Sequence, residues 1–157
     1  MKLKPTSTHR LFVLALLFFA QFAAGQQVRE IVLYVDTGNI QNPNVNDFCN
    51  FGQPADISNE DFTTDANVGD TIVWRGISST NPGDQVLIES INHEGDRGGR
   101  DIFGQNVLPG ENGMVQGVVR NSTAGGPPYK YKITFRVLNN DEPRQGVYNI
   151  DPKIRIN

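Results

Sequence analysis

The sequence predicts an all-β protein whose strands form an antiparallel β-sandwich. Two segments near the C-terminus, Tyr129–Leu138 and Val147–Asn157, alternate apolar and polar residues with a period of two. That period is typical of antiparallel strands with one face in the core and the other in solvent. About seven short segments of strand-like composition are separated by turn signals, a spacing that favours a sandwich. No segment after residue 25 has the sustained 3.6-residue period of an amphipathic helix.

The segment Thr71–Trp74 is expected to lie at the centre of the core. It follows the turn signal Gly69-Asp70 and consists of β-branched and aromatic residues. It also contains the only tryptophan of the chain. A side chain of this size is usually buried, so we expect the other strands to pack around Trp74.

Four further strands are predicted from local composition and alternation. They are expected over Val28–Asp36, Phe62–Ala66, Gln85–His93 and Met114–Val119. In the third of these, strict alternation places Val86 and Ile88 on one face and Leu87 and Ile91 on the opposite face.

The two C-terminal strands carry the polar residues of an exposed sheet face. In Tyr129–Leu138, the alternation places Lys130 and Lys132 on this solvent-exposed side. In Val147–Asn157, Pro152 cannot donate a ladder hydrogen bond. The last strand is therefore expected to be an edge strand or to carry a bulge at that position.

Two long connections have no regular period. Residues 37–61 are rich in Asn, Pro, Gly and Asp and are expected to form an irregular excursion, anchored by Phe48 and Phe51. Cys49, in the same segment, is the only cysteine, so no intramolecular disulfide can form. We expect a buried thiol there; a free thiol or an intermolecular bridge is the alternative. The second connection, Glu94–Gly113, is polar and rich in glycine.

Residues 1–25 have the features of a secretory signal peptide. Lys2, Lys4 and Arg10 precede the apolar segment Leu11–Ala24, and small residues precede Gln26. About 14 apolar positions are fewer than the ~20 that a spanning helix needs, although a retained anchor is the alternative. Cleavage is expected to leave one domain, residues 26–157, which is either secreted or periplasmic. We therefore expect no membrane span after cleavage.

The mature domain is acidic. Removing the three basic residues of the leader from the formal charge of −3 leaves −6 for residues 26–157. An acidic domain without a cluster of basic residues argues against nucleic acid and against anionic membrane surfaces as partners.

Parts of the chain resemble two known families. Val68–Trp74 resembles the "GDTVTW" strand of cupredoxin-like domains, and the two C-terminal strands resemble the final hairpin of that fold. This resemblance implies a Greek-key β-sandwich. A weaker resemblance is to the AidA/PixA inclusion-body family, in which a similar strand is followed by an aromatic-x-x-Asp-Pro element. Tyr148, Asp151 and Pro152 have that spacing here.

The metal chemistry of the cupredoxin-like family is not expected here. A type-1 copper site needs two imidazoles and a thiolate, the thiolate lying near the final hairpin. His93 is the only histidine after the leader, Cys49 lies far upstream, and residues 139–146 contain no Cys, His or Met. We therefore expect no cofactor. The weaker alternative is calcium, bound by the carboxylates of the 94–113 connection, namely Glu94, Asp96, Asp101 and Glu111.

The sequence is interpreted as that of a non-catalytic binding module for a protein or glycan ligand in the envelope or extracellular space. Binding groups collect on loops of rigid sandwiches, so the 94–113 connection and the residue before it supply the candidate site. Its expected binding residues are His93, Arg97, Arg100, Asp101 and Phe103. Two alternatives stay open: an electron-transfer or metal-binding cupredoxin-type protein, and a loop-sited hydrolase that pairs Ser90 or Ser122 with His93. Ile102-Phe103 could instead pack into the core.

Overall fold

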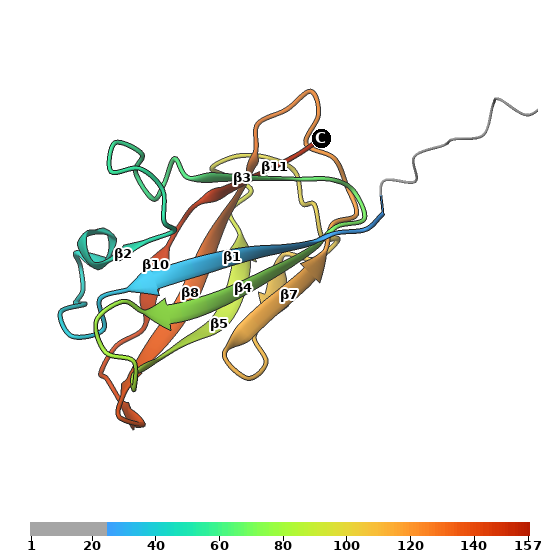
Figure 1. The fold of residues 1–157 in the computed structure, drawn as a ribbon. Helices are drawn as coiled ribbons and strands as arrows, with labels where there is room; N and C mark the ends of the chain where they lie inside the picture. The colour runs from blue at the N-terminus through green and yellow to red at the C-terminus, as the bar shows by residue number, and fades with distance from the viewer. Residues whose placement is uncertain (1–24) are drawn as a thin grey trace, which may run out of the picture.

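The computed structural model describes residues 25–157 and is a β-sandwich of two sheets (Figure 1). The prediction of this fold class is confirmed. The proposed signal peptide lies outside the described residues, apart from Gly25. The strands are β1 Val28–Val35, β2 Cys49–Asn50, β3 Thr63–Ala66, β4 Thr71–Ser78, β5 Gln85–His93, β6 Val107–Pro109, β7 Met114–Val118, β8 Tyr129–Asn139, β9 Glu142–Pro143, β10 Tyr148–Ile150 and β11 Lys153–Ile156. A single turn of 3₁₀ helix, η1, covers Val45–Phe48.

The strands pair in two mixed sheets rather than purely antiparallel ones. The first sheet has the order β2-β1-β4-β7, and the second has the order β3-β11-β8-β5-β6, with β9 and β10 also paired to β8. Two pairs are parallel: β1 with β4 over their whole lengths, and β3 with β11. A period of two shows that a strand has two different faces, but it carries no information on the direction of the neighbouring strand. The expectation of an antiparallel sandwich therefore holds for most pairs and not for these two.

Trp74 is at the centre of the core, as expected. Only 1% of its surface is exposed. Its indole Nε1 donates a hydrogen bond to the hydroxyl of Tyr131 at 3.2 Å, which satisfies both buried polar groups. The indole ring also contacts Phe103 and Tyr131 edge to face, with centroids 5.7 and 5.8 Å apart. Trp74 thus joins the first sheet to β8 of the second.

The alternation expected in β5 is wrong at one position. The register with β8 shifts between Ile88 and Ser90, which is the signature of a β-bulge. Because of the extra residue, each side chain of β5 after the bulge lies on the face opposite to the one that strict alternation predicts. Val86, Ile88 and Ile91 are therefore all buried on the core face.

The C-terminal segment is divided at Pro152 into two strands, which corrects the expectation of one edge strand or one strand with a bulge. β11 pairs with β3 on one side and with β8 on the other. β10 ends at Ile150 and pairs with the middle of β8, whereas β11 begins at Lys153 and pairs with the start of β8. The break leaves Asp151 beside Lys130, where its backbone carbonyl and its carboxylate both face the lysine ammonium.

The 37–61 excursion is more ordered than expected. It contains η1 and β2, and its anchors are confirmed, since Phe51 is buried and stacks on Phe62 at a centroid distance of 4.6 Å. Cys49 is buried, and its thiol lies 2.9 Å from the carbonyl oxygen of Val45. Burial raises the pKa of this thiol to about 12, so it is protonated at neutral pH. The expectation of a buried thiol is confirmed.

Acid is expected to destabilise the fold through carboxylates such as Asp70. Hydrogen bonds from the backbone N–H of Gln27 and that of Asn67 hold the pKa of Asp70 below its usual value of 3.8. Because folding favours the ionised form, this contribution is complete above the unfolded pKa and is lost as pH falls through the lower folded pKa. The free energy of unfolding should therefore fall between about pH 5 and about pH 2. Urea titrations across this range measure the slope.

The variant Asp70→Asn isolates the contribution of this carboxylate. It should be less stable than the wild type at neutral pH, and its stability should fall less steeply in acid, because position 70 no longer takes up a proton. An unchanged slope in the variant would assign the acid sensitivity to other carboxylates. Asp36, Asp61 and Asp84 also have lowered pKa values, owing first to side-chain hydrogen bonds from Asn39, Lys153 and Thr37 respectively.

Candidate functional site

His93 ends β5 and begins the loop in which the binding residues were expected. Its ring stacks on that of Tyr129 with centroids 4.8 Å apart. Its Nε2 lies 3.2 Å from the carbonyl oxygen of Gly99, and since a carbonyl only accepts, this bond requires the proton on Nε2. The imidazole is therefore held in one orientation by two contacts within the protein.

Phe103 is a core residue, which corrects the expectation that it would contact a ligand. It is 3% exposed and packs edge-on against Trp74 and against Tyr129, at 5.4 Å from the latter. The neighbouring Ile102 is fully buried. Burial of two adjacent apolar residues draws the middle of the loop onto the sandwich. The alternative interpretation of Ile102-Phe103 is thus the correct one.

Asp101 supports this turn. Its carboxylate accepts a hydrogen bond from the backbone N–H of Phe103 at 2.8 Å. Such a bond over two residues is an Asx turn, which fixes the local backbone. The structure therefore gives Asp101 a role in shaping the loop.

Arg97 lies in a cluster of ion pairs. Its guanidinium pairs with the carboxylates of Glu60, Glu94 and Asp151. About 46% of its side chain is exposed, so the pairs are partly screened by solvent. Arg97 thus forms ion pairs with three carboxylates from three separate segments of the chain. The sequence did not predict these intramolecular pairs.

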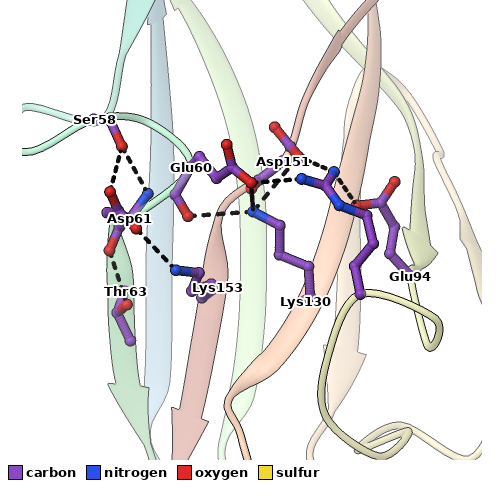
Figure 2. Close-up of polar contacts among 9 residues, drawn as sticks. Ser58, Glu60, Asp61, Thr63, Glu94, Lys130, Asp151 and Lys153 are labelled. Atoms are coloured by element: carbon purple, nitrogen blue, oxygen red, sulfur yellow. Dashed lines mark hydrogen bonds and ion pairs between the residues drawn. The ribbon is translucent and has the colours of Figure 1, made fainter.

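Lys130 is buried at the same cluster, although alternation along the strand predicted an exposed side chain. Only 3% of the residue is exposed. Its ammonium donates to the backbone carbonyls of Glu60 and Asp151 and lies 3.6 and 3.5 Å from their carboxylates (Figure 2). Residues 58–62 pass over this end of β8, and that cover removes the lysine from solvent.

The cluster continues along the chain segment that covers Lys130. Lys153 pairs with Asp61 at 2.9 Å, and Asp61 also accepts a hydrogen bond from Ser58 (Figure 2). The contacts join the end of the excursion, the start of β8 and the break between β10 and β11. They form a structural clamp, since each charged group in it is paired within the protein.

A shallow, open groove of about 560 Å³ lies beside the clamp. Its residues have charged, amide or imidazole side chains, apart from one glycine: Asn92, His93, Glu94, Gly95, Asp96, Arg97, Asn106 and Lys132. The amide of Asn92 is held by hydrogen bonds to Ser90 and Thr134, at 2.9 and 3.3 Å. Most polar groups of the groove are therefore fixed before any ligand arrives.

Two cations at this end of the molecule are uncommitted. Within residues 25–157, neither Arg100 nor Lys132 forms an ion pair. Lys132 was not among the expected site residues, because the sequence placed it on an ordinary strand face. Its pairing opposite Asn92 of β5, one residue before the predicted site, is the contact that brings it into the groove.

Several of the candidate metal-ligating and catalytic groups are engaged in other contacts. No group of three or more His, Cys, Asp or Glu side chains in the described part of the chain could hold a metal ion. The carboxylates of Glu94 and Asp101 accept bonds from Arg97 and from the Phe103 backbone instead. The two serines considered for catalysis, Ser90 and Ser122, are bonded to Asn92 and to the carbonyl of Ile156.

Comparisons with known proteins give no relative from which a function could be carried over. No family model matches the chain, and no curated protein matches its sequence. The resemblances to cupredoxin-like domains and to the AidA/PixA family therefore stay proposals. In residues 25–157, no helix is long and apolar enough to cross a membrane.

Proposed function

We propose that this chain is a secreted or periplasmic, non-catalytic binding module with a cupredoxin-like sandwich that lacks copper. The observation that carries the proposal is the polar groove at the end of β5. Its imidazole and amide groups are already ordered, and Lys132 lines it. Arg100 follows Gly99, whose carbonyl accepts the bond from His93, and neither cation has an ion-pair partner in the described chain.

Preorganisation is the physical argument for binding at this place. A ligand that meets fixed side chains does not have to order them, and this ordering costs about 0.5–1.5 kcal/mol for each long side chain. The groove offers hydrogen-bond donors and acceptors but no exposed aromatic ring, because Phe103 and Tyr129 are buried. A polar ligand is therefore favoured, either a glycan or a protein segment, with an anionic group that pairs with Lys132 or with Arg100.

The proposal predicts that these two cations determine affinity. Arg100→Ala and Lys132→Ala should each weaken binding about tenfold, equivalent to about 1.4 kcal/mol, with an unchanged melting temperature. Binding is measured on an array of acidic and neutral glycans, and by pull-down from the native compartment. Arg155→Ala is the matched control, because Arg155 is an exposed cation on β11 without an ion pair within residues 25–157.

The outcomes separate the proposal from its rivals. If Arg100→Ala, Lys132→Ala and the control Arg155→Ala all bind as tightly as the wild type, the groove is excluded as the binding site. Arg97→Ala is not a clean probe of binding, since Arg97 also pairs with three carboxylates of the clamp. Uptake of one copper ion per chain, lost in Cys49→Ser, would instead favour the electron-transfer alternative. Ester hydrolysis lost in His93→Gln would favour the hydrolase.

The expected secretion is tested by the mass of the exported protein, which should begin at Gln26.

A further inference from the structure

The outer face of the β2-β1-β4-β7 sheet is unusually apolar for a surface in contact with solvent. Residues of β1, β4 and β7 that point away from the core lie in cross-strand rows set by the register. Seven of the eleven are apolar or aromatic, namely Val28, Val32, Tyr34, Val73, Ile77, Met114 and Val118, and the other four are Glu30, Thr71, Arg75 and Gln116. Three of these side chains are among the exposed large hydrophobic residues of the described chain: Val28, Met114 and Val118.

The outer face of the other sheet has a different composition. Apart from the covered Lys130, its outward residues on β8, β10 and β11 are Lys132, Thr134, Arg136, Leu138, Asn149, Lys153 and Arg155, of which only Leu138 is apolar. These charged and polar side chains are typical of a sheet face that stays in water. The apolar character of the first face is therefore a local property of one sheet and not a general feature of the surface.

No described segment covers this face. In Figure 1 the second sheet lies behind β1 and β4, and no described strand or loop passes in front of them. The apolar rows are therefore open to a partner.

The charges on this face are self-complementary. Glu30 and Arg75 lie on adjacent strands near its centre and form an ion pair, with Arg75 Nη2 3.3 Å from Glu30 Oε2. They are the only charged residues among the eleven, so the face as a whole is neutral. A two-fold axis that lies between the two sheets, parallel to them and perpendicular to the line from Glu30 to Arg75, places each Glu30 opposite the Arg75 of the other copy. A strongly acidic or basic partner would meet no complementary field here.

We propose that two copies of this chain associate through this face, as an isologous dimer in which the two sheets pack against each other. Side chains of aligned sheets interdigitate at about 10 Å separation, which would bury the apolar rows of both copies. Each Glu30 and Arg75 would then have an intermolecular partner in addition to its own. The interface is separate from the groove and independent of the proposed ligand site.

The area of this face determines the affinity that we expect for the dimer. Eight residues at about 3.3 Å and four strands at about 4.8 Å cover an area of roughly 26 by 19 Å at most. This is smaller than the ~800 Å² per partner of a standard stable interface. The dimer should therefore be weak, with a dissociation constant in the micromolar range.

Sedimentation velocity of residues 26–157 tests the proposal directly. The weight-average mass should rise from that of one chain to that of two between about 1 μM and about 1 mM. Val118→Lys should keep the protein monomeric across this range, because it places a charge in the apolar rows. Val107→Lys is the matched control, since Val107 is 50% exposed and Val118 49%, but Val107 lies on β6 of the other sheet.

Charge exchange distinguishes a second copy from any other occupant. Glu30→Arg gives two arginines at the centre of the face, and Arg75→Glu gives two glutamates, so each variant alone should be monomeric. An equimolar mixture of the two restores opposite charges at both crossed contacts and should form a heterodimer. Both variants lose the intramolecular pair equally, so recovery in the mixture can come only from contact between copies. The equivalent exchange at Glu89 and Arg136, an exposed pair on the other sheet, should leave association unchanged.

Any one of the following results would overturn the proposal. The first is a wild-type chain that is still monomeric at about 1 mM. The second is a dimer that survives Val118→Lys, or that is lost as readily in Val107→Lys. The third is a mixture of the two charge variants that stays monomeric while the tryptophan emission of each variant is native. Dimerisation only of chains that keep residues 1–25 would assign the face to that segment instead.

Discussion

Trp74→Ala should lower the free energy of unfolding by about 3–5 kcal/mol, the largest loss expected from a single core substitution in this chain. The substitution removes a buried indole that contacts Phe103 and Tyr131 and joins the two sheets. It also leaves the hydroxyl of Tyr131 buried without its donor, which adds to the cost of the cavity. Urea unfolding is followed by far-ultraviolet circular dichroism, because the variant has no tryptophan fluorescence.

Trp74→Phe is the control that separates packing from the hydrogen bond. It keeps an aromatic ring at the centre of the core but lacks the indole N–H, and its loss should be about 1–3 kcal/mol. A loss below about 1 kcal/mol in the alanine variant would contradict the position assigned to this strand.

Lys130→Met should cost about 2–3 kcal/mol, the second largest effect. Methionine fills a similar volume but removes the ammonium that donates to the carbonyls of Glu60 and Asp151. Breaking a buried ion pair by removing one partner costs about 3–5 kcal/mol, and the estimate is reduced here because Glu60 is half-exposed. Urea unfolding, monitored by the emission of Trp74, measures the change.

Lys132→Met is the matched control on the same strand. Lys132 is two residues away, is only partly buried, and forms no ion pair within residues 25–157. Its replacement should change stability by less than about 0.5 kcal/mol while weakening ligand binding at the groove. Equal losses in the two variants would mean that the clamp contributes nothing specific to the fold.

The clamp and the groove divide the residues of the 94–113 loop between two roles. Arg97, Asp101 and Phe103 are engaged with the protein itself, through ion pairs, a turn and the core. Arg100 remains free to meet a ligand, and Lys132 joins it from β8. The binding site that we propose is therefore smaller than the one the loop sequence suggested, and part of it comes from a strand.

The sequence alone determined the β-sandwich, the positions of its longer strands and the central residue. The predicted segment Gln85–His93 coincides with β5, and the run from Thr71 begins β4. These features depend on local properties, namely alternation, β-branching, turn residues and the missing donor of Pro152. Burial of Trp74 also followed from local information, because an aromatic side chain of this size in a strand is usually buried.

Only the tertiary structure decided which chain segments meet. Strand alternation carries no record of a neighbour's direction, so it did not reveal the parallel pair of β1 and β4. A single extra residue at the β5 bulge moved Ile91 into the core, and residues 58–62 covered Lys130, which alternation had placed in water. Each of these outcomes depends on contacts between residues far apart in the chain. Their free energies arise only when the segments pack together, so no local pattern around Ile91 or Lys130 contains them.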